Sequence, residues 1–474
     1  MQATTVLYLV VAAAVLGGIR LLSSPHYARW GNGLAAVAIL AAIVLVMAQH
    51  NLLTTSSVLT AIAVGSVGGA ALAIQVKMIQ MPQLVALLNG CGGAASMFIA
   101  LAEASSPLAS AVLWAATFAV TGLAVIVGSF TLSGSLVAAG KLHGVLNEKA
   151  IILPQHSWLT VVLMAGLAVY LVAGALSPIT GIGTYSLILL PFSLALGVIV
   201  TVRIGGADMP VVITFLNAAS GLAASLCGFV TENALLVACG AMVGASGVLL
   251  SHKMCRAMNR SLLTVFLGFE RQSSQGQEQE VAALHSHGDV GGADPVGLSV
   301  ELLRDAKDVI IVPGYGMAVS QAQFKIWELA QALEARGARV RFAIHPVAGR
   351  MPGHMNVLLA EAGVPYEKLF EMDAINEDFK RSDVGLVVGA CDVVNPAAIN
   401  VPGTPISGMP ILKVYDSKHI IVCKRTKSPG YSGVENPLFY HDNAIFLAGD
   451  ATCTMLSLID GLSISKSDGE NGDE

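Results

Sequence analysis

The chain has 474 residues, of which 54% are hydrophobic and 12% are charged, and its mean hydropathy is +0.70. Soluble domains carry about twice that share of charged residues, so water alone would not keep this chain folded. The formal net charge of −5 gives no support for nucleic-acid binding. The seven cysteines include no CxxC pair, which argues against a disulfide framework and a structural zinc site. No metal is expected.

The composition changes sharply near residue 270. Before it the sequence is almost continuously apolar, and only ten of the 26 Lys and Arg residues precede position 272. After it a polar stretch leads into an alternating αβ pattern. We therefore predict a transmembrane domain at 1–260, a linker at 261–294 and a soluble domain at 295–474.

Nine apolar segments in the first part are each long enough to cross a bilayer, which takes roughly 20 residues. They lie near 4–22, 33–49, 57–76, 84–102, 109–138, 158–177, 184–203, 210–230 and 233–252. The first has no basic stretch before it and resembles those that follow. We interpret it as a retained helix rather than a signal peptide. An α-helical bundle of about nine transmembrane helices in a lipid bilayer is expected.

Basic residues alternate between the two sides of this bundle. Every odd-numbered segment is followed by Lys or Arg, whereas the loops after the even-numbered segments contain neither. Because basic residues concentrate in cytoplasmic loops, this asymmetry puts the N-terminus outside and the C-terminal domain in the cytoplasm, or in the matrix of a mitochondrion. We expect a multi-pass protein of the inner (cytoplasmic) membrane.

The apolar segments are rich in Gly, Ala, Ser and Thr, which let helices pack closely in lipid. Few ionisable groups fall inside them, and polar residues within a membrane are candidates for function. For proton movement or its coupling we select Asn89, Ser135 and Asn217, with Asp208 at the cytoplasmic edge. The alternatives are that the first three only join neighbouring helices and that Asp208 only caps the helix that starts near Pro210.

Residues 272–295 lack periodicity and are rich in Gln, Ser, Gly and His, a composition typical of a flexible tether. Beyond them, 309–313 predicts a short buried strand, followed by a glycine-rich turn, a helix from about 320 to 336 and a second strand at 338–344. In such a βαβ unit the glycines let a pyrophosphate approach the backbone at the helix N-terminus. The third glycine of the usual fingerprint is replaced by Val319.

The end of the second strand bears on cofactor choice. It ends at His345 and Pro346, without the acidic residue that holds the ribose hydroxyls in NAD-preferring sites. Further strands are predicted at 384–389 and 419–423, and the basic cluster 424–427 follows the last of them. A basic cluster at the end of a parallel strand suits the 2′-phosphate of NADP, whereas the alternative is a solvated charged turn. We expect a soluble α/β domain with a Rossmann-like, doubly wound parallel sheet.

Four longer motifs resemble one family. They are GGADMP at 205–210, PGYGMAV at 313–319, HPVAGRMPGHMNVLLAEA at 345–362 and DVVNPAA at 392–398. On these motifs the whole chain resembles the beta subunit of the proton-translocating NAD(P) transhydrogenase, including its membrane domain and its NADP(H)-binding third domain.

The resemblance implies reversible hydride transfer, NADH + NADP+ to NAD+ + NADPH, coupled to inward proton movement. This chain would bind NADP(H). Its partner would be an alpha subunit, of one or two chains, that carries the NAD(H)-binding domain and further membrane helices. Two such units would form a two-fold dimer. In the family the nucleotide lies across the strand ends in a flipped orientation, so the glycine-rich turn need not mark the adenosine position.

The resemblance also implies roles for particular residues. Asp392 has the catalytic position, near the nicotinamide and linked to the proton-coupled switch, while Lys424 and Arg425 meet the 2′-phosphate and the stretch to Tyr431 closes over it. The cofactor-binding positions are Gly314, Tyr315, Gly316, Met317, Ala318, Val319, His345, Val347, Ala348, Gly349, Arg350, Met351, Pro352, Gly389, Ala390, Cys391, Asp392, Val393, Gly408, Met409, Lys424, Arg425, Gly430, Tyr431, Asp450 and Ala451.

Two positions depart from the family. Some members carry a membrane-embedded His where this chain has 87–90, and Cys391 stands where the family usually has Asn. An amide cannot titrate near neutrality as imidazole does, so Asn89, Ser135 and Asn217 are relay or gate positions at most. A different functional class also stays open at this point, namely a channel or transporter gated by a nucleotide-sensing cytoplasmic domain.

Overall fold

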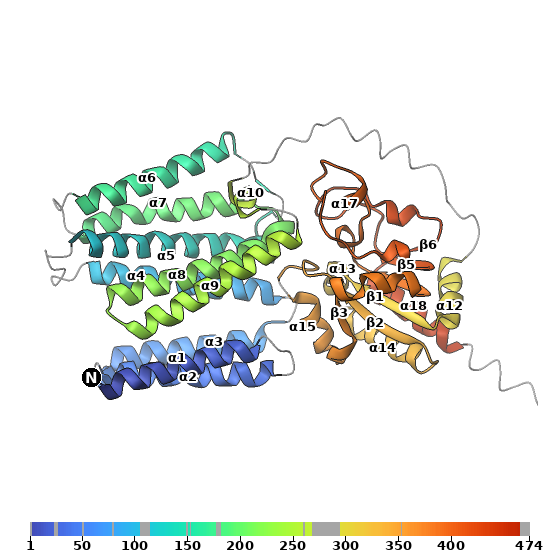
Figure 1. Cartoon of the computed structure of the whole chain (residues 1–474), viewed down its shortest axis with the longest axis horizontal. Helices are drawn as coiled ribbons and strands as arrows, with labels where there is room; N and C mark the ends of the chain where they lie inside the picture. Colours follow the sequence, from blue (N-terminus) through green and yellow to red (C-terminus); the bar gives the residue numbers. More distant parts are fainter. Residues whose placement is uncertain are drawn as a thin grey trace, which may run out of the picture. The chain divides into compact units, whose positions relative to one another are not determined.

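The structure is a computed structural model of the whole chain (Figure 1). It describes residues 2–22, 27–49, 52–77, 80–104, 114–147, 150–151, 153–176, 182–258, 261–267, 294–351 and 353–464. Contacts divide the chain into two compact units, Met1–Arg203 with Val212–Leu250 and Ile204–Val211 with Ser251–Glu474. Most of the predicted linker lies outside the described residues. Each unit is described by itself.

Within the described residues, nine long helices correspond to the nine predicted membrane segments (Figure 1). They are α1 (Gln2–Leu22), α2 (Ala28–Gln49), α3 (Ser56–Gln75), α4 (Met81–Ala104), α5 (Trp114–His143), α6 (His156–Leu176), α7 (Ile182–Val202), α8 (Met209–Val230) and α9 (Ala234–Ala257). Eight of them, α2 to α9, are long and apolar enough to span a membrane, while the apolar stretch Val6–Leu22 of α1 is shorter. The prediction of a multi-pass helical bundle is confirmed.

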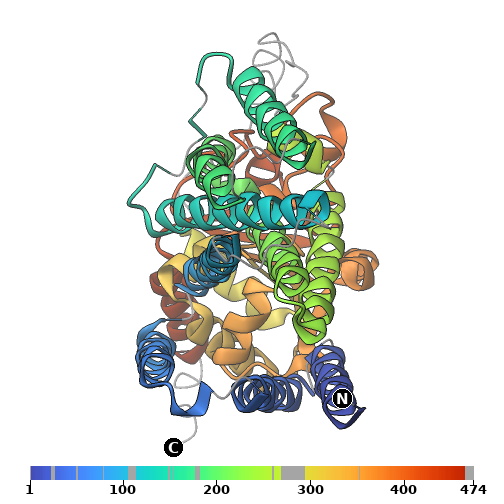
Figure 2. The same ribbon diagram turned by 90° about the vertical axis from the view of Figure 1, so that its left-hand side faces the viewer.

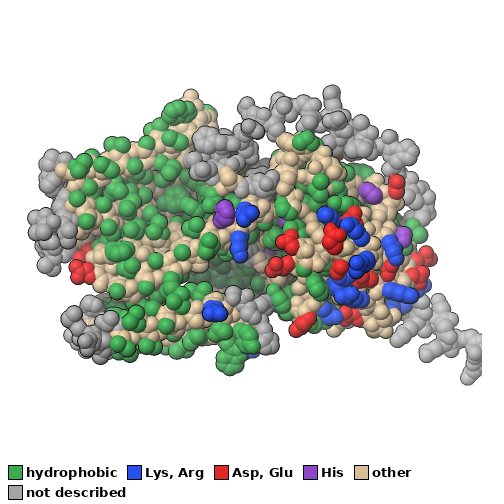
Figure 3. Space-filling view, in the orientation of Figure 1, with side chains coloured by type: hydrophobic (Ala, Val, Ile, Leu, Met, Phe, Trp, Pro, Cys, Tyr) green, Lys and Arg blue, Asp and Glu red, His purple; other side chains and the backbone are tan. Residues whose placement is uncertain are grey.

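Glycines let some of these helices approach each other closely. A Cβ added to Gly93 of α4 would lie 2.7 Å from the carbonyl oxygen of Gly128 in α5, and one added to Gly221 of α8 would lie 2.5 Å from the amide nitrogen of Gly244 in α9. In contrast, a Cβ on Gly65 of α3 would meet nothing within 4 Å. Figure 2 shows the helices of this unit after a turn of 90° from Figure 1, and Figure 3 shows the hydrophobic side chains that cover its visible face.

The soluble domain is built on one parallel sheet. Its strands are β1 (Asp308–Pro313), β2 (Arg339–Ile344), β3 (Leu369–Glu371), β4 (Val384–Val388), β5 (His419–Lys424) and β6 (Ala444–Ala448). Their order is β3-β2-β1-β4-β5-β6, and every neighbouring pair is parallel. This is the doubly wound order of the Rossmann fold, in which the order reverses between β1 and β4. The predicted fold class is confirmed.

Helices and irregular segments cover both faces of this sheet. The helices are α12 (Pro295–Asp305), α13 (Tyr315–Ser320), α14 (Gln323–Glu334), α15 (His354–Glu361), α16 (Met372–Ile375), α17 (Ala397–Asn400) and α18 (Ala451–Ile464). Successive strand residues point to opposite faces. Val309 and Ile311 of β1 pack with α12, α14, α15 and α18 in one core, and Ile310 and Val312 pack in the other.

Three elements differ from the expectations. The predicted helix 320–336 corresponds to α14, which begins at Gln323, and the stretch predicted as a glycine-rich turn contains a further short helix, α13, which ends where Gln321 adopts a left-handed conformation with φ of 54°. Strand β3 is three residues long, too short for a periodic signal, and β6 was also missed. The two omitted strands form the outer edges of the sheet, where side chains are less buried than in β1 or β4.

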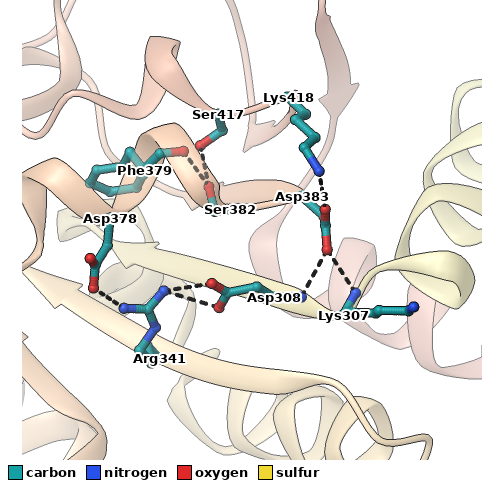
Figure 4. A network of polar contacts seen from close by, with 9 residues as sticks. All are labelled: Lys307, Asp308, Arg341, Asp378, Phe379, Ser382, Asp383, Ser417 and Lys418. Carbon is teal, nitrogen blue, oxygen red and sulfur yellow. Dashed lines mark hydrogen bonds and ion pairs between the residues drawn. The ribbon is translucent and has the colours of Figure 1, made fainter.

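A charged network joins the strands at the amino-terminal edge of the sheet (Figure 4). Arg341 of β2 has a side chain only 4% exposed, and it lies between the carboxylates of Asp308 and Asp378. Its Nη2 donates to both oxygens of Asp308, at 2.7 and 3.0 Å. Nearby, Asp383 accepts hydrogen bonds from the amides of Lys307 and Asp308. The network ties β1, β2 and the start of β4 together.

Candidate functional site

Five segments with predicted binding residues follow strands β1, β2, β4, β5 and β6. They contain Gly314 to Val319, His345 to Met351, Gly389 to Val393, Arg425 to Tyr431, and Asp450 with Ala451. The carboxyl ends of parallel strands share one edge, and ligands of such sheets bind outside that edge where the strand order reverses. The fold therefore brings these segments to one edge, opposite the network of Figure 4.

The glycine-rich turn after β1 packs directly on the turn after β4. The amide of Gly314 donates to the carbonyl of Val388, and that of Gly316 donates to the carbonyl of Gly389, each at 2.9 Å. A Cβ on Gly314 would lie 2.3 Å from Cα of Ala390. These two amides are the kind of donors that a standard Rossmann turn offers to a pyrophosphate. Here they hold two loops together, so the pattern does not mark a standard pyrophosphate cradle.

His345 anchors the loop after β2. The side chain is buried, its Nδ1 accepts from the amide of Val347 at 3.2 Å, and its Nε2 lies 2.8 Å from the carbonyl of Pro410. These partners require a neutral ring that carries its proton on Nε2. Burial lowers the pKa of His345 to about 4, against the effect of the Pro410 hydrogen bond. The same contact places Gly408 and Met409 beside this loop.

His354, at the start of α15, shapes the next part of the loop. Its Nδ1 accepts from the amide of Arg350 at 3.1 Å. Gly349 has φ of 103°, and a Cβ there would lie 2.5 Å from Nδ1 of His354. Burial, followed by the charge of Arg350, lowers the pKa of His354 to about 4. Both histidines thus serve as neutral supports of the loop that carries Arg350.

Three loops meet at an aromatic and cationic cluster made of Tyr315, Arg350 and Tyr431. The Arg350 guanidinium lies 4.5 Å from the ring centroid of Tyr315, a cation–π contact, and its Nη2 donates to the Tyr431 hydroxyl at 3.2 Å. The rings of Tyr315 and Tyr431 are 5.9 Å apart. The loop after β5 therefore reaches past β4 and β1 to the loop of β2.

The basic residues at the end of β5 have two different roles. Nζ of Lys424 donates to the carbonyls of Thr426 and Ser428 and so organises its own turn. Arg425 is 64% exposed and forms a 2.7 Å ion pair with Asp450. This pair, through its hydrogen bond, lowers the pKa of Asp450. Arg425 can present its remaining donors to a phosphate, because a guanidinium has five.

The segment 425–436, called the β5 loop below, is tied to the turn after β4. Asp392 accepts hydrogen bonds from the amide and hydroxyl of Ser432. Nδ2 of Asn436 donates to the carbonyl of Cys391 at 3.0 Å, and Nδ2 of Asn395 donates to that of Glu435 at 3.0 Å. These contacts join two segments about forty residues apart in sequence.

The membrane unit brings three predicted polar residues to one region. Nδ2 of Asn89 in α4 donates to the carbonyl of Ile213 in α8 at 3.3 Å, and Asn217 lies one helical turn further along α8. Ser135 of α5 touches α4, because a Cβ on Gly90 would lie 3.0 Å from its Cβ. Oγ of Ser135 is buried and has no hydrogen-bond partner among the described residues. Asp208 ends the short turn directly before α8.

Not all of the predicted cofactor residues can line a site in the same way. The side chains of Met317, Ala318 and Ala390 are buried in the two hydrophobic cores that flank the sheet. They therefore pack behind the binding edge, and only their backbone could contact a ligand. Pro352 lies outside the described residues. Ser432, Asn395 and Asn436 were not predicted as site residues from the sequence. Asn436 carried a signal, since an Asn followed by Pro is a typical helix start, and it accepts from the amide of Leu438.

Comparison with known proteins gives the same family as the motifs. The family model described as NAD(P) transhydrogenase beta subunit matches residues 4–460. The chain belongs to this family. An NAD(P) transhydrogenase subunit beta from Rhodospirillum rubrum is 42% identical over 458 residues, which cover 94% of this chain and 96% of the relative. The subunit from strain ATCC 11170 of that species matches to the same extent. The chain is thus a multi-pass membrane subunit of a transhydrogenase, and the name beta subunit implies an alpha partner.

Proposed function

We propose that the chain is the NADP(H)-binding, proton-translocating subunit of an NAD(P) transhydrogenase. Hydride would pass reversibly between NAD(H) on the alpha subunit and NADP(H) on this chain, coupled to inward proton movement. The observation that carries the NADP(H) assignment is the exposed Arg425 at the carboxyl end of β5, in a domain where β2 is followed by His345 and not by an acidic residue. A guanidinium is a preferred partner for a phosphate, whereas in standard Rossmann sites an acidic residue after the second strand favours the ribose hydroxyls of NAD.

The residues at this edge fit such a nucleotide. Arg425 would meet the 2′-phosphate, Arg350 with Tyr315 and Tyr431 would flank the ligand with positive charge and aromatic surface, and the β5 loop would cover it. Bound NADP(H) supplies the hydride chemistry, so the protein needs no acid for that step. Its own task is to hold the ring in position and to exclude water.

The membrane unit would carry the proton. Asn89, Ser135 and Asn217 lie where α4, α5 and α8 meet, and a buried hydroxyl such as that of Ser135 can relay a proton through water. An amide or hydroxyl does not titrate near neutrality, so these three residues would relay or gate the proton, either with a titratable group from the alpha subunit or with water conducting without one. We place the N-terminus outside and the soluble domain in the cytoplasm, in a two-fold dimer in the inner membrane. Proton movement would bias the soluble domain between two states of different NADP(H) affinity.

The test uses inverted membrane vesicles that contain this chain with its alpha partner. NADPH formation from NADH is measured with and without an imposed proton gradient. Transfer that is stimulated by the gradient and is lost without the alpha partner is expected. Ion or solute flux gated by NADP(H), with no hydride transfer, would refute the proposal in favour of a nucleotide-gated channel or transporter.

A further inference from the structure

The carboxylate of Asp392 is held by one residue of the β5 loop. Ser432 Oγ donates to Oδ1 at 2.7 Å, and the Ser432 amide donates to Oδ2 at 3.1 Å. The same Oγ accepts from the amide of Val434 at 3.2 Å. The Val434 N–H uses a lone pair of Oγ and not its proton, so the Ser432 hydroxyl donates that proton to the carboxylate oxygen. Both oxygens of Asp392 are therefore engaged by a single residue.

The approach of the two segments depends on Gly430. A Cβ at this position would lie 2.7 Å from both carboxylate oxygens of Asp392, closer than real Cβ contacts. Gly433 follows with φ of 71° and donates to the carbonyl of Gly430 at 3.2 Å, which turns the chain so that Ser432 faces the acid. The backbone conformation at Gly430 and Gly433 thus places the Ser432 hydroxyl within hydrogen-bond distance of Asp392.

Cys391, the residue before Asp392, cannot replace the Ser432 hydroxyl as a strong hydrogen-bond donor. The side chain directly before Asp392 is the thiol of Cys391, and a thiol is a weak hydrogen-bond donor compared with a hydroxyl. Burial, followed by the charge of Asp392, raises the pKa of the Cys391 thiol to about 11, so the side chain stays neutral. A hydroxyl from the β5 loop is the stronger donor available to this carboxylate.

We propose that Ser432 is a positioning residue that fastens the β5 loop to Asp392 and thereby slows the release of NADP(H). The loop starts at β5, is pinned at β4 by Ser432, and reaches Arg350 of the β2 loop through Tyr431. The β5 loop crosses the carboxyl ends of the strands, and the nucleotide would lie between these strand ends and the loop. The inference rests on the proposed function, since a fastened loop retards release only if NADP(H) binds beneath it.

The experiment measures the rate at which NADPH leaves the purified full chain, from the fluorescence change when excess NADP+ displaces it. Ser432→Ala is expected to raise the release rate about tenfold, which corresponds to about 1.4 kcal/mol. Ser432→Thr keeps the hydroxyl and retains slow release. Ser457→Ala, which removes an exposed hydroxyl bonded within α18, is the matched control and leaves the rate unchanged.

A double-mutant cycle with Asp392→Ala separates positioning from a general loss of structure. If Ser432 acts through Asp392, its substitution has little further effect in the Asp392→Ala background, which has no acceptor for the Ser432 hydroxyl. Ser432→Cys, of nearly the same volume but with a weak donor, accelerates release too and serves if the alanine variant fails to fold. NADPH bound by the wild type but released at the same rate by Ser432→Ala or Ser432→Cys would overturn the inference, as would additive effects in the cycle. Wild-type protein that binds no NADPH would instead refute the proposed function.

Discussion

The network around Arg341 leads to a prediction about which partner matters more. Its guanidinium side chain is 4% exposed, whereas the carboxylates of Asp308 and Asp378 are 22% and 39% exposed. Water can therefore solvate the acids in part, but not the base. Nε of Arg341 already has no hydrogen-bond partner among the described residues. The cation is the member of the network that depends most on its partners.

Asp308→Ala removes the carboxylate that accepts two hydrogen bonds from Arg341. Removing one partner of a buried pair costs about 3–5 kcal/mol, and the lower end applies because Asp378 remains. Arg341→Met removes the buried charge itself and leaves an apolar side chain between acids that water reaches. Replacing buried ions by apolar groups is often close to neutral, so we expect a cost of about 1 kcal/mol.

Hydrogen exchange in the full chain measures both costs. Amides in core strands exchange through openings whose free energy approaches that of global unfolding of their unit, so peptides that cover β1 and β2 report on the soluble domain. We expect protection to fall more in Asp308→Ala than in Arg341→Met, and the double variant to resemble Arg341→Met. An Arg341→Met cost equal to or above that of Asp308→Ala would refute the reasoning from desolvation.

Three further predictions concern pH, the phosphate site and helix packing. Because burial lowers the pKa of His345 from 6.5 to about 4, its contribution to stability is present above pH 6.5 and is lost as the pH falls toward 4. Between pH 7 and pH 5 this loss is about 2 kcal/mol, and thermal unfolding of His345→Gln at both pH values should show a smaller difference than the wild type. Arg425→Gln should weaken NADPH binding at least about tenfold through a lost charge-assisted contact, whereas Arg381→Gln, at an exposed site, should leave the titration unchanged. Gly93→Ala should destabilise the detergent-solubilised bundle by about 1–3 kcal/mol through overpacking, while Gly65→Ala, with open space around it, should leave the melting temperature the same or slightly higher.

The membrane helices were predictable because each depends mainly on its own composition. A span in lipid must satisfy its backbone hydrogen bonds within itself, so a one-dimensional pattern locates it to within a few residues. The central strands β1 and β4 are continuous apolar runs for a similar reason, since both faces of a parallel sheet are buried. Edge strand β3 has three residues and little burial, and no local pattern distinguishes it from a turn.

For the candidate site, the sequence predicted which segments follow the strands but not how those segments contact each other. Glycines after β1 were visible in the sequence, but their partner was not. Whether Gly316 donates to a phosphate or to the carbonyl of Gly389 depends on how two loops some seventy residues apart pack. The short helix α13, which ends before Gln321, was likewise not predicted, because the sequence there reads as a turn. Local rules fail at these positions because distant segments decide the backbone conformation.

The position of Ser432 illustrates how such a contact can compensate for a local change. Asp392 needs donors if its carboxylate is to stay in one orientation, and a neighbour in sequence is one source of them. With Cys391 before it, that source is weak, and a residue of the next loop supplies the hydroxyl instead. The consequence is that orientation of the acid and closure of the loop become one event.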